Sequence, residues 1–127
     1  MAHVVILGAG LGGMAGAYEM RAALGKEHKV TVVNESPDYV FIPSNPWIAV
    51  SWRKRSQTSF PIAPPLARKG IDFVCQHADK IDAANNRVHL ADGSTLDYDH
   101  LLITTGPKLV FGNTPGAGPH GGFTQSV

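Results

Sequence analysis

Apolar and β-branched residues are concentrated in short runs that are bounded by glycine or polar residues. The clearest runs cover residues 4–7, 29–33 and 101–105. Each run is short and nearly continuous, which is typical of a strand buried on both faces of a parallel sheet. Residues 11–24 are rich in alanine and contain no proline, so they predict a helix that ends at Gly25. Strand, helix and strand in this order predict a βαβ unit with a right-handed crossover.

Prolines and aromatic residues dominate the middle of the chain. Residues 36–66 hold six of the nine prolines and five aromatic side chains. This composition predicts an ordered excursion over the domain, with short helices at 45–50 and 64–69. A long ordered loop usually serves a site; a loop that only covers the sheet is the alternative.

Short strands are predicted again from residue 71 onward. Runs at 71–75, 78–82, 87–90 and 95–96, with a turn at Asp92-Gly93, predict one more parallel strand and then an antiparallel meander over about residues 76–98. Residues 106–127 are glycine-rich and lack periodicity. The predicted fold is therefore one α/β domain, Rossmann-like and three-layered, with a parallel sheet, an inserted β-meander and a truncated, glycine-rich end.

Composition narrows the function classes. The 127 residues carry a net charge of +1, which gives no general attraction to nucleic acid, and the basic run at 53–55 is expected to be a solvated face. No stretch reaches the length of a membrane span, so we expect a cytoplasmic protein. A single cysteine, Cys75, excludes an internal disulfide, and its apolar neighbours predict a buried structural thiol. The six histidines are scattered, and we expect no metal site.

The strongest chemical signal is the glycine turn after the first strand. Gly8, Gly10 and Gly13 satisfy the pattern G-x-G-x-x-G between a strand and a helix, which is the context that binds a dinucleotide pyrophosphate. This predicts binding of FAD or NAD. The end of the second strand normally carries a carboxylate for the adenosine ribose; here Asn34 occupies that position and Glu35 follows it.

Three segments together resemble one family. The glycine turn, residues 39–47 (Tyr-Val-Phe-Ile-Pro-Ser-Asn-Pro-Trp) and the strand-Thr-Gly element within residues 92–108 are similar to sulfide:quinone oxidoreductases, which are FAD enzymes of the two-dinucleotide-binding-domain superfamily. The resemblance covers the whole chain, residues 1–127, as a partial FAD-binding domain. It implies that the parent enzyme oxidises sulfide and passes electrons through FAD to quinone.

The resemblance also assigns cofactor-binding residues. It implies that FAD contacts the glycine turn, the end of the second strand, the Pro-Ser-Asn loop, the strand after Cys75 and the strand-Thr-Gly element. These residues are Gly8, Gly10, Leu11, Gly12, Gly13, Asn34, Glu35, Pro43, Ser44, Asn45, Ala78, Thr105 and Gly106. Asn34 and Thr104 depart from the usual Glu and Ala of the family.

The resemblance implies no catalytic residue in this chain. The reactive cysteines, the second dinucleotide-like domain and the membrane-docking helices of the family lie beyond a point such as Val127. The parent is expected at the inner face of the cell membrane, and the piece alone is expected to be inactive. Three alternatives stay open: a stand-alone FAD- or NAD-binding module, part of a type II NADH:quinone dehydrogenase, and a unit that forms a homodimer through an unpaired sheet edge.

Overall fold

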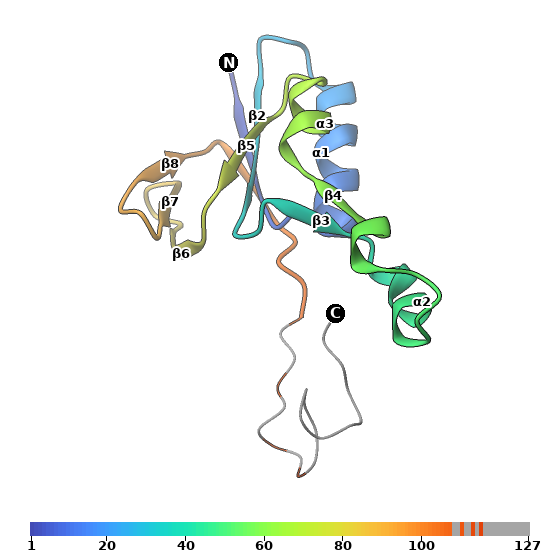
Figure 1. Ribbon diagram of the computed structural model, residues 1–127. Coiled ribbons are helices and arrows are strands. Elements are labelled where there is room, and N and C mark those ends of the chain that lie inside the picture. The colour runs from blue at the N-terminus through green and yellow to red at the C-terminus, as the bar shows by residue number, and fades with distance from the viewer. Residues whose placement is uncertain (108–109, 111–112, 114, 116–127) are drawn as a thin grey trace.

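The computed structural model describes residues 1–107, 110, 113 and 115, so most of the glycine-rich end predicted at 106–127 lies outside the described residues (Figure 1). The strands are β1 (His3–Leu7), β2 (Lys29–Asn34), β3 (Asp38–Val40), β4 (Ser59–Pro61), β5 (Asp72–Cys75), β6 (Ala78–Asp82), β7 (Arg87–Leu90), β8 (Thr95–Asp97) and β9 (His100–Ile103). The helices are α1 (Leu11–Ala23), α2 (Asn45–Ala49) and α3 (Ala63–Ala67), with 3-10 turns η1 (Ile42–Ser44) and η2 (Arg55–Gln57).

The centre of the domain is a four-stranded parallel sheet in the order β5-β2-β1-β9. β1 pairs with β2 in register from His3 opposite Lys29 to Leu7 opposite Val33, and β9 pairs with the other side of β1. The predicted βαβ unit and the parallel strands are confirmed. Because all four strands run in one direction, their carboxyl ends share one edge of the sheet.

The sheet is buried on both faces, as its continuous apolar runs predict. Alternate residues of β1 and β2 enter two separate cores. Val4, Ile6, Val30 and Val32 pack on the helix side with residues of α1 and α3, whereas Val5, Leu7 and Val33 pack on the other side with Val88 and Leu90. Figure 1 shows α1 and α3 over one face and the strands β6–β8 beyond the other, so the three-layer prediction is confirmed.

The meander consists of β6, β7 and β8 in sequential antiparallel order. Its β7 supplies the two fully or almost fully buried side chains Val88 and Leu90 to the second core. An exposed ion pair between Arg87 and Asp97 joins β7 to β8. The predicted meander is therefore present, and it covers a face of the sheet.

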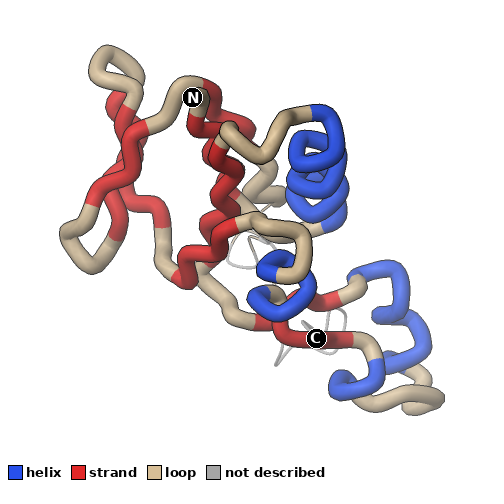
Figure 2. The backbone as a smooth tube through the Cα atoms, turned by 90° about the horizontal axis from the view of Figure 1, so that it is seen from above, coloured by secondary structure: helices blue, strands red, loops and turns tan. Residues whose placement is uncertain are grey.

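Residues 36–66 form an ordered excursion, as predicted, although they are more regular than their proline content indicated. β3 and β4 pair antiparallel, and the rings of Tyr39 and Phe60 lie 4.9 Å apart across this pair. Figures 1 and 2 show α2 extending away from the central sheet. Trp47 is exposed on α2, and Trp52 and Arg53 are exposed on the turn that follows it; the Arg53 guanidinium lies 4.9 Å from the Trp47 ring.

Candidate functional site

A cavity of about 490 Å³ opens at the carboxyl ends of the parallel strands. Six residues that the sequence assigned to the cofactor line it: Gly8, Asn34, Glu35, Ala78, Thr105 and Gly106. Gly8 follows β1, Asn34 and Glu35 lie at the end of β2, Ala78 begins β6, and Thr105 and Gly106 follow β9, so the lining residues are up to 98 residues apart in the chain. Ligands of open α/β sheets bind at this edge, so the cavity is the candidate site.

The remaining predicted residues lie in two other places. The N-cap and first turn of α1, next to the Gly8 turn, consist of Gly10, Leu11, Gly12 and Gly13. The excursion contains Pro43, Ser44 and Asn45. None of these residues lines the cavity. Four lining residues were missed: Val33, Gln76, His77 and Pro107. Each lies within two residues of Asn34, Ala78 or Gly106 in the sequence, and this proximity is the signal that could have found them.

Gly8 makes the turn possible for two reasons. Its φ of +96° lies in the region that favours glycine, and a Cβ at this position would come within 2.6 Å of the carbonyl oxygen of Thr104. The Gly8 amide donates to the carbonyl oxygen of Val33 at 2.8 Å. The turn is thereby held between β2 and the end of β9.

Gly13 allows α1 to pack against that turn. A Cβ at Gly13 would overlap the carbonyl oxygen of Gly8 and would lie 2.7 Å from Thr104 Oγ1. The Thr104 hydroxyl donates to the carbonyl oxygens of Leu7 at 2.9 Å and Gly8 at 3.0 Å. Thr104 therefore joins the end of β9 to the glycine turn.

The N-terminus of α1 has free donors and open space. The first helical bond runs from the Met14 amide to the Gly10 carbonyl oxygen, so the amides of Leu11, Gly12 and Gly13 have no acceptor within the helix. Gly10 provides no side-chain cap, the first turn holds no acidic residue, and a Cβ at Gly10 would meet no atom within 4 Å. Amides in this arrangement suit a phosphate.

The Asn34 side chain fixes the backbone at the carboxyl ends of the strands. Its Oδ1 accepts a hydrogen bond from the Ala9 amide at 3.0 Å, and its Nδ2 donates to the carbonyl oxygen of Ser36 at 2.9 Å. One end of the side-chain amide therefore holds Ala9, the residue after Gly8, and the other end holds the start of the excursion at Ser36. The carboxylate of Glu35 is exposed and lies 3.0 Å from His77 Nδ1.

Cys75 is exposed, so the prediction of a buried structural thiol is wrong. Phe73 and Val74 pack into the two cores, but Cys75 is the last residue of β5, an edge strand, and the cover of the cores ends before it. Its Sγ lies 3.7 Å from the carbonyl oxygen of Glu35. The apolar neighbours that suggested burial belong to the part of the strand that is covered.

The Pro-Ser-Asn loop carries one unusual polar atom. Ser44 is buried, and Asn45 Oδ1 is buried without a hydrogen-bond partner among the residues that the structure describes. A buried acceptor without a partner costs free energy, so such an atom is often one that a ligand or another segment satisfies.

The described part of the chain lacks a metal-binding cluster and a membrane-spanning helix. It contains no group of three or more His, Cys, Asp or Glu residues placed to hold a metal ion. None of its helices combines the length and the apolar character that crossing a bilayer would require.

Comparison with known proteins gives the family. The profile of the pyridine nucleotide-disulphide oxidoreductases matches residues 2–127. The sulfide-quinone reductase of Aquifex aeolicus is 42% identical over 110 residues, which are 87% of this chain and 25% of that protein. The external alternative NAD(P)H-ubiquinone oxidoreductase B4 of Arabidopsis thaliana, a mitochondrial protein, is 30% identical over 98% of this chain and 22% of its own length.

The solved structures agree with the sequence comparison. The crystal structure of the Aquifex aeolicus sulfide:quinone oxidoreductase matches with a TM-score of 0.84 and 41% identity, over 88% of this chain and 26% of that one. The chain thus spans about a quarter of the length of the relatives it matches. On its sequence and its fold, the chain belongs to the pyridine nucleotide-disulphide oxidoreductases, a family of flavin-dependent enzymes, and within it resembles sulfide:quinone oxidoreductases.

Proposed function

We propose that this chain is the FAD-binding part of a sulfide:quinone oxidoreductase-like enzyme. The observation that carries the proposal is the coincidence of three free amides at the start of α1 with the open space at Gly10, beside the cavity at the sheet edge. A dinucleotide needs both a phosphate site and adjacent room for its nucleoside, and the chain offers both.

In this proposal, different residues of the chain bind different parts of FAD. Gly10 and the amides of Leu11, Gly12 and Gly13 receive the pyrophosphate, and the cavity residues Gly8, Asn34, Glu35 and Ala78 surround the adenosine. Thr105 and Gly106 border the cofactor on the β9 side, and Pro43, Ser44 and Asn45 approach the flavin, where Asn45 Oδ1 gains a partner. When bound, the flavin supplies two-electron redox chemistry.

The electron donor and acceptor are inferred from the relatives. The 42% identity to a sulfide-quinone reductase favours sulfide and quinone over the reaction of the NAD(P)H-ubiquinone oxidoreductase, which is 30% identical. Both relatives are named for quinone reduction, so quinone is the better supported of the two substrates. Action at the membrane surface and a homodimer are part of this proposal for the parent enzyme.

Visible absorption of the purified chain tests the cofactor. After addition of FAD and gel filtration, we expect flavin absorption to remain with the protein. Gly10→Ala adds a Cβ into open space, so it should leave the fold intact and weaken FAD binding at least about ten-fold by crowding the phosphates.

Gly12→Ala is the matched control for this variant. Its Cβ would lie 3.8 Å from Thr104 Cγ2, an ordinary contact, and its amide is retained. Because Gly12 is proposed to bind only through this amide, FAD binding by Gly12→Ala should weaken much less than that of Gly10→Ala. The proposed site is wrong if the wild-type chain retains no FAD, or if Gly10→Ala binds FAD as tightly as the wild type.

A further inference from the structure

The excursion carries an unusual concentration of exposed apolar side chains. Twelve large apolar residues of the described part of the chain are exposed, and half of them lie within residues 41–60. Trp52 is 77% exposed, the highest fraction among these residues after that of Met1. The six residues are Phe41, Ile42, Trp47, Val50, Trp52 and Phe60. Large apolar side chains gathered in one short exposed segment are typical of a surface that meets a partner.

The backbone that carries the two tryptophans is closed by its own hydrogen bonds. The amides of Trp52 and Arg53 both donate to the Trp47 carbonyl oxygen, at 2.8 and 3.2 Å. Ser51 has a φ of +61°, which is uncommon for a residue other than glycine, and its amide donates to the Ile48 carbonyl oxygen at 2.9 Å. The Arg53 guanidinium lies within cation–π distance of the Trp47 ring. The turn therefore presents Trp52 in a fixed geometry, which lowers the entropy cost of binding.

Charge is distributed unevenly between the excursion and the meander. Residues 39–71 contain five Lys or Arg and no Asp or Glu, whereas residues 78–99 contain five Asp and only two Lys or Arg. Three of the cations, residues 53–55, are exposed on the segment after α2. Figures 1 and 2 show α2 and the strands β6–β8 on opposite sides of the central sheet. An anionic surface would therefore attract the excursion, repel the meander and so orient the domain.

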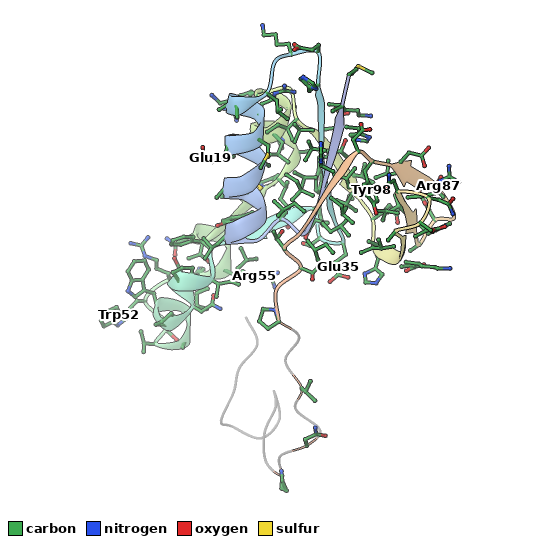
Figure 3. All side chains as sticks on the ribbon, turned by 180° about the vertical axis from the view of Figure 1, so that it is seen from behind. Glu19, Glu35, Trp52, Arg55, Arg87 and Tyr98 are labelled. Atoms are coloured by element: carbon green, nitrogen blue, oxygen red, sulfur yellow. The ribbon has the colours of Figure 1, made fainter. Side chains whose placement is uncertain are left out.

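The chemistry of residues 47–55, here called the tryptophan turn, suits the headgroup region of an anionic membrane. Tryptophan concentrates in this region because its ring is amphipathic, and Lys and Arg bind the negatively charged lipids there. An acidic protein segment would satisfy the charges alone, whereas a lipid surface accepts the rings and the cations together. Figure 3 shows Trp52 at the outer end of the excursion, away from the sheet, where a flat surface can reach it.

We propose that the tryptophan turn is a membrane-binding site for anionic lipids, in which Trp52 inserts among the headgroups and Lys54 and Arg55 pair with lipid phosphates. The inference rests on the proposed action at the membrane surface, and it names residues of this chain that make the contact. It adds this contact to the docking helices that the family resemblance places beyond Val127. It does not need bound FAD, so the membrane site and the cofactor site can be tested separately.

Vesicle sedimentation and tryptophan fluorescence test this site. Trp47 and Trp52 are the only tryptophans of the chain, so their emission reports on the turn itself. Vesicles of phosphatidylcholine with one third phosphatidylglycerol should bind the chain at least about ten-fold more tightly than vesicles of phosphatidylcholine alone. The tryptophan emission should shift to shorter wavelength on binding. Trp52→Ala should weaken binding about five-fold, and the double variant Lys54→Gln, Arg55→Gln about ten-fold.

The double variant Arg68→Gln, Lys69→Gln is the matched control. It removes the same two charges from the same segment without acidic residues. These two residues are exposed between α3 and β5, toward the amino ends of the parallel strands, whereas the excursion leaves from the carboxyl end of β2. Their distance from the tryptophan turn makes them weak contributors at physiological salt, so this variant should bind anionic vesicles within about two-fold of the wild type.

The inference is wrong if the wild type does not sediment with anionic vesicles, or if its tryptophan emission stays unchanged when it does. Equal losses of affinity in the two double variants would also overturn it, because attraction would then follow net charge alone. A shift that appears without vesicles as the protein concentration rises would assign the turn to a second copy of the chain instead. FAD retention is measured on the same preparations: failure of vesicle binding with FAD retained overturns only this inference, whereas vesicle binding without FAD retention overturns only the proposed cofactor site.

Discussion

The contact between α1 and the glycine turn leads to a stability prediction for Gly13→Ala. A Cβ at Gly13 would overlap the Gly8 carbonyl oxygen and lie 2.9 Å from the Gly8 carbonyl carbon. These are backbone atoms, so no side-chain rotation can relieve the overlap, and α1 has to move away from the turn. Overpacking of this kind costs about 3 kcal/mol, whereas replacing glycine by alanine in a helix gains about 1 kcal/mol. The expected net loss is about 2 kcal/mol.

Gly12→Ala isolates the steric part of this loss. It makes the same chemical change one residue earlier, in the same turn of α1, and meets only an ordinary contact at 3.8 Å. It should gain about 0.5–1 kcal/mol from helix propensity alone. The two variants should therefore differ by about 3 kcal/mol in the free energy of unfolding, or about 10 °C in Tm for a domain of this size.

Urea unfolding followed by far-ultraviolet circular dichroism is the suitable assay. Trp47 and Trp52 are exposed on the excursion, so their fluorescence would report poorly on the packing of α1. The variants should differ in the urea midpoint and share the slope with denaturant. If Gly13→Ala proves as stable as Gly12→Ala, α1 does not pack on the Gly8 carbonyl as the structure has it, and the reasoning is refuted.

Three further predictions use the same unfolding assay. Asn34→Ala should lose about 1–3 kcal/mol, because the Ala9 amide and the Ser36 carbonyl lose their partners, and wild-type stability would contradict that role. The pKa of His3 is lowered, chiefly by burial, so the unfolded chain binds a proton at His3 at a higher pH than the folded chain does. The free energy of unfolding should therefore fall as the pH drops below about 6.5. His3→Gln should make the free energy of unfolding less dependent on pH in this range. The hydrogen bond from Arg87 lowers the pKa of Asp97, so the contribution of this pair to stability should be complete above about pH 4 and disappear at lower pH. Arg87→Ala should remove this contribution. If acid unfolding of Arg87→Ala follows the wild-type pH profile, the pair does not stabilise the domain.

The central sheet could be predicted from the sequence because its strands are short, continuous apolar runs. Val4 to Leu7 and Val30 to Val33 send alternate side chains into two cores, and only a sheet covered on both faces gives such a pattern. The helix between them follows from its composition and its glycine borders. These elements are determined locally, and the structure has them within one or two residues of the predicted bounds.

The features that were missed depend on contacts between distant residues. The β3–β4 pair has three residues in each strand and ends in Pro61, so no periodicity marks it; the packing of Tyr39 on Phe60 accompanies it. Cys75 looked buried because its neighbours are apolar, but burial depends on where the covering layers end. His77 reaches Glu35 only through the pairing of β2 with β5, which the sequence spacing alone does not reveal.

The polar groups at the carboxyl edge of the sheet fall into two sets with different consequences. Asn34 and Thr104 direct their hydrogen bonds inward, to Ala9, Ser36, Leu7 and Gly8, and so hold the glycine turn in place. The amides of Leu11, Gly12 and Gly13 have no acceptor within the helix, and the Glu35 carboxylate is exposed at the same edge. Substitutions in the first set should therefore lower stability and affect binding through the turn, whereas substitutions in the second set should change affinity at nearly constant stability. In the proposed site, the Asn34 and Thr104 side chains hold the turn, whereas the α1 amides and the Glu35 carboxylate are the groups available to a nucleotide.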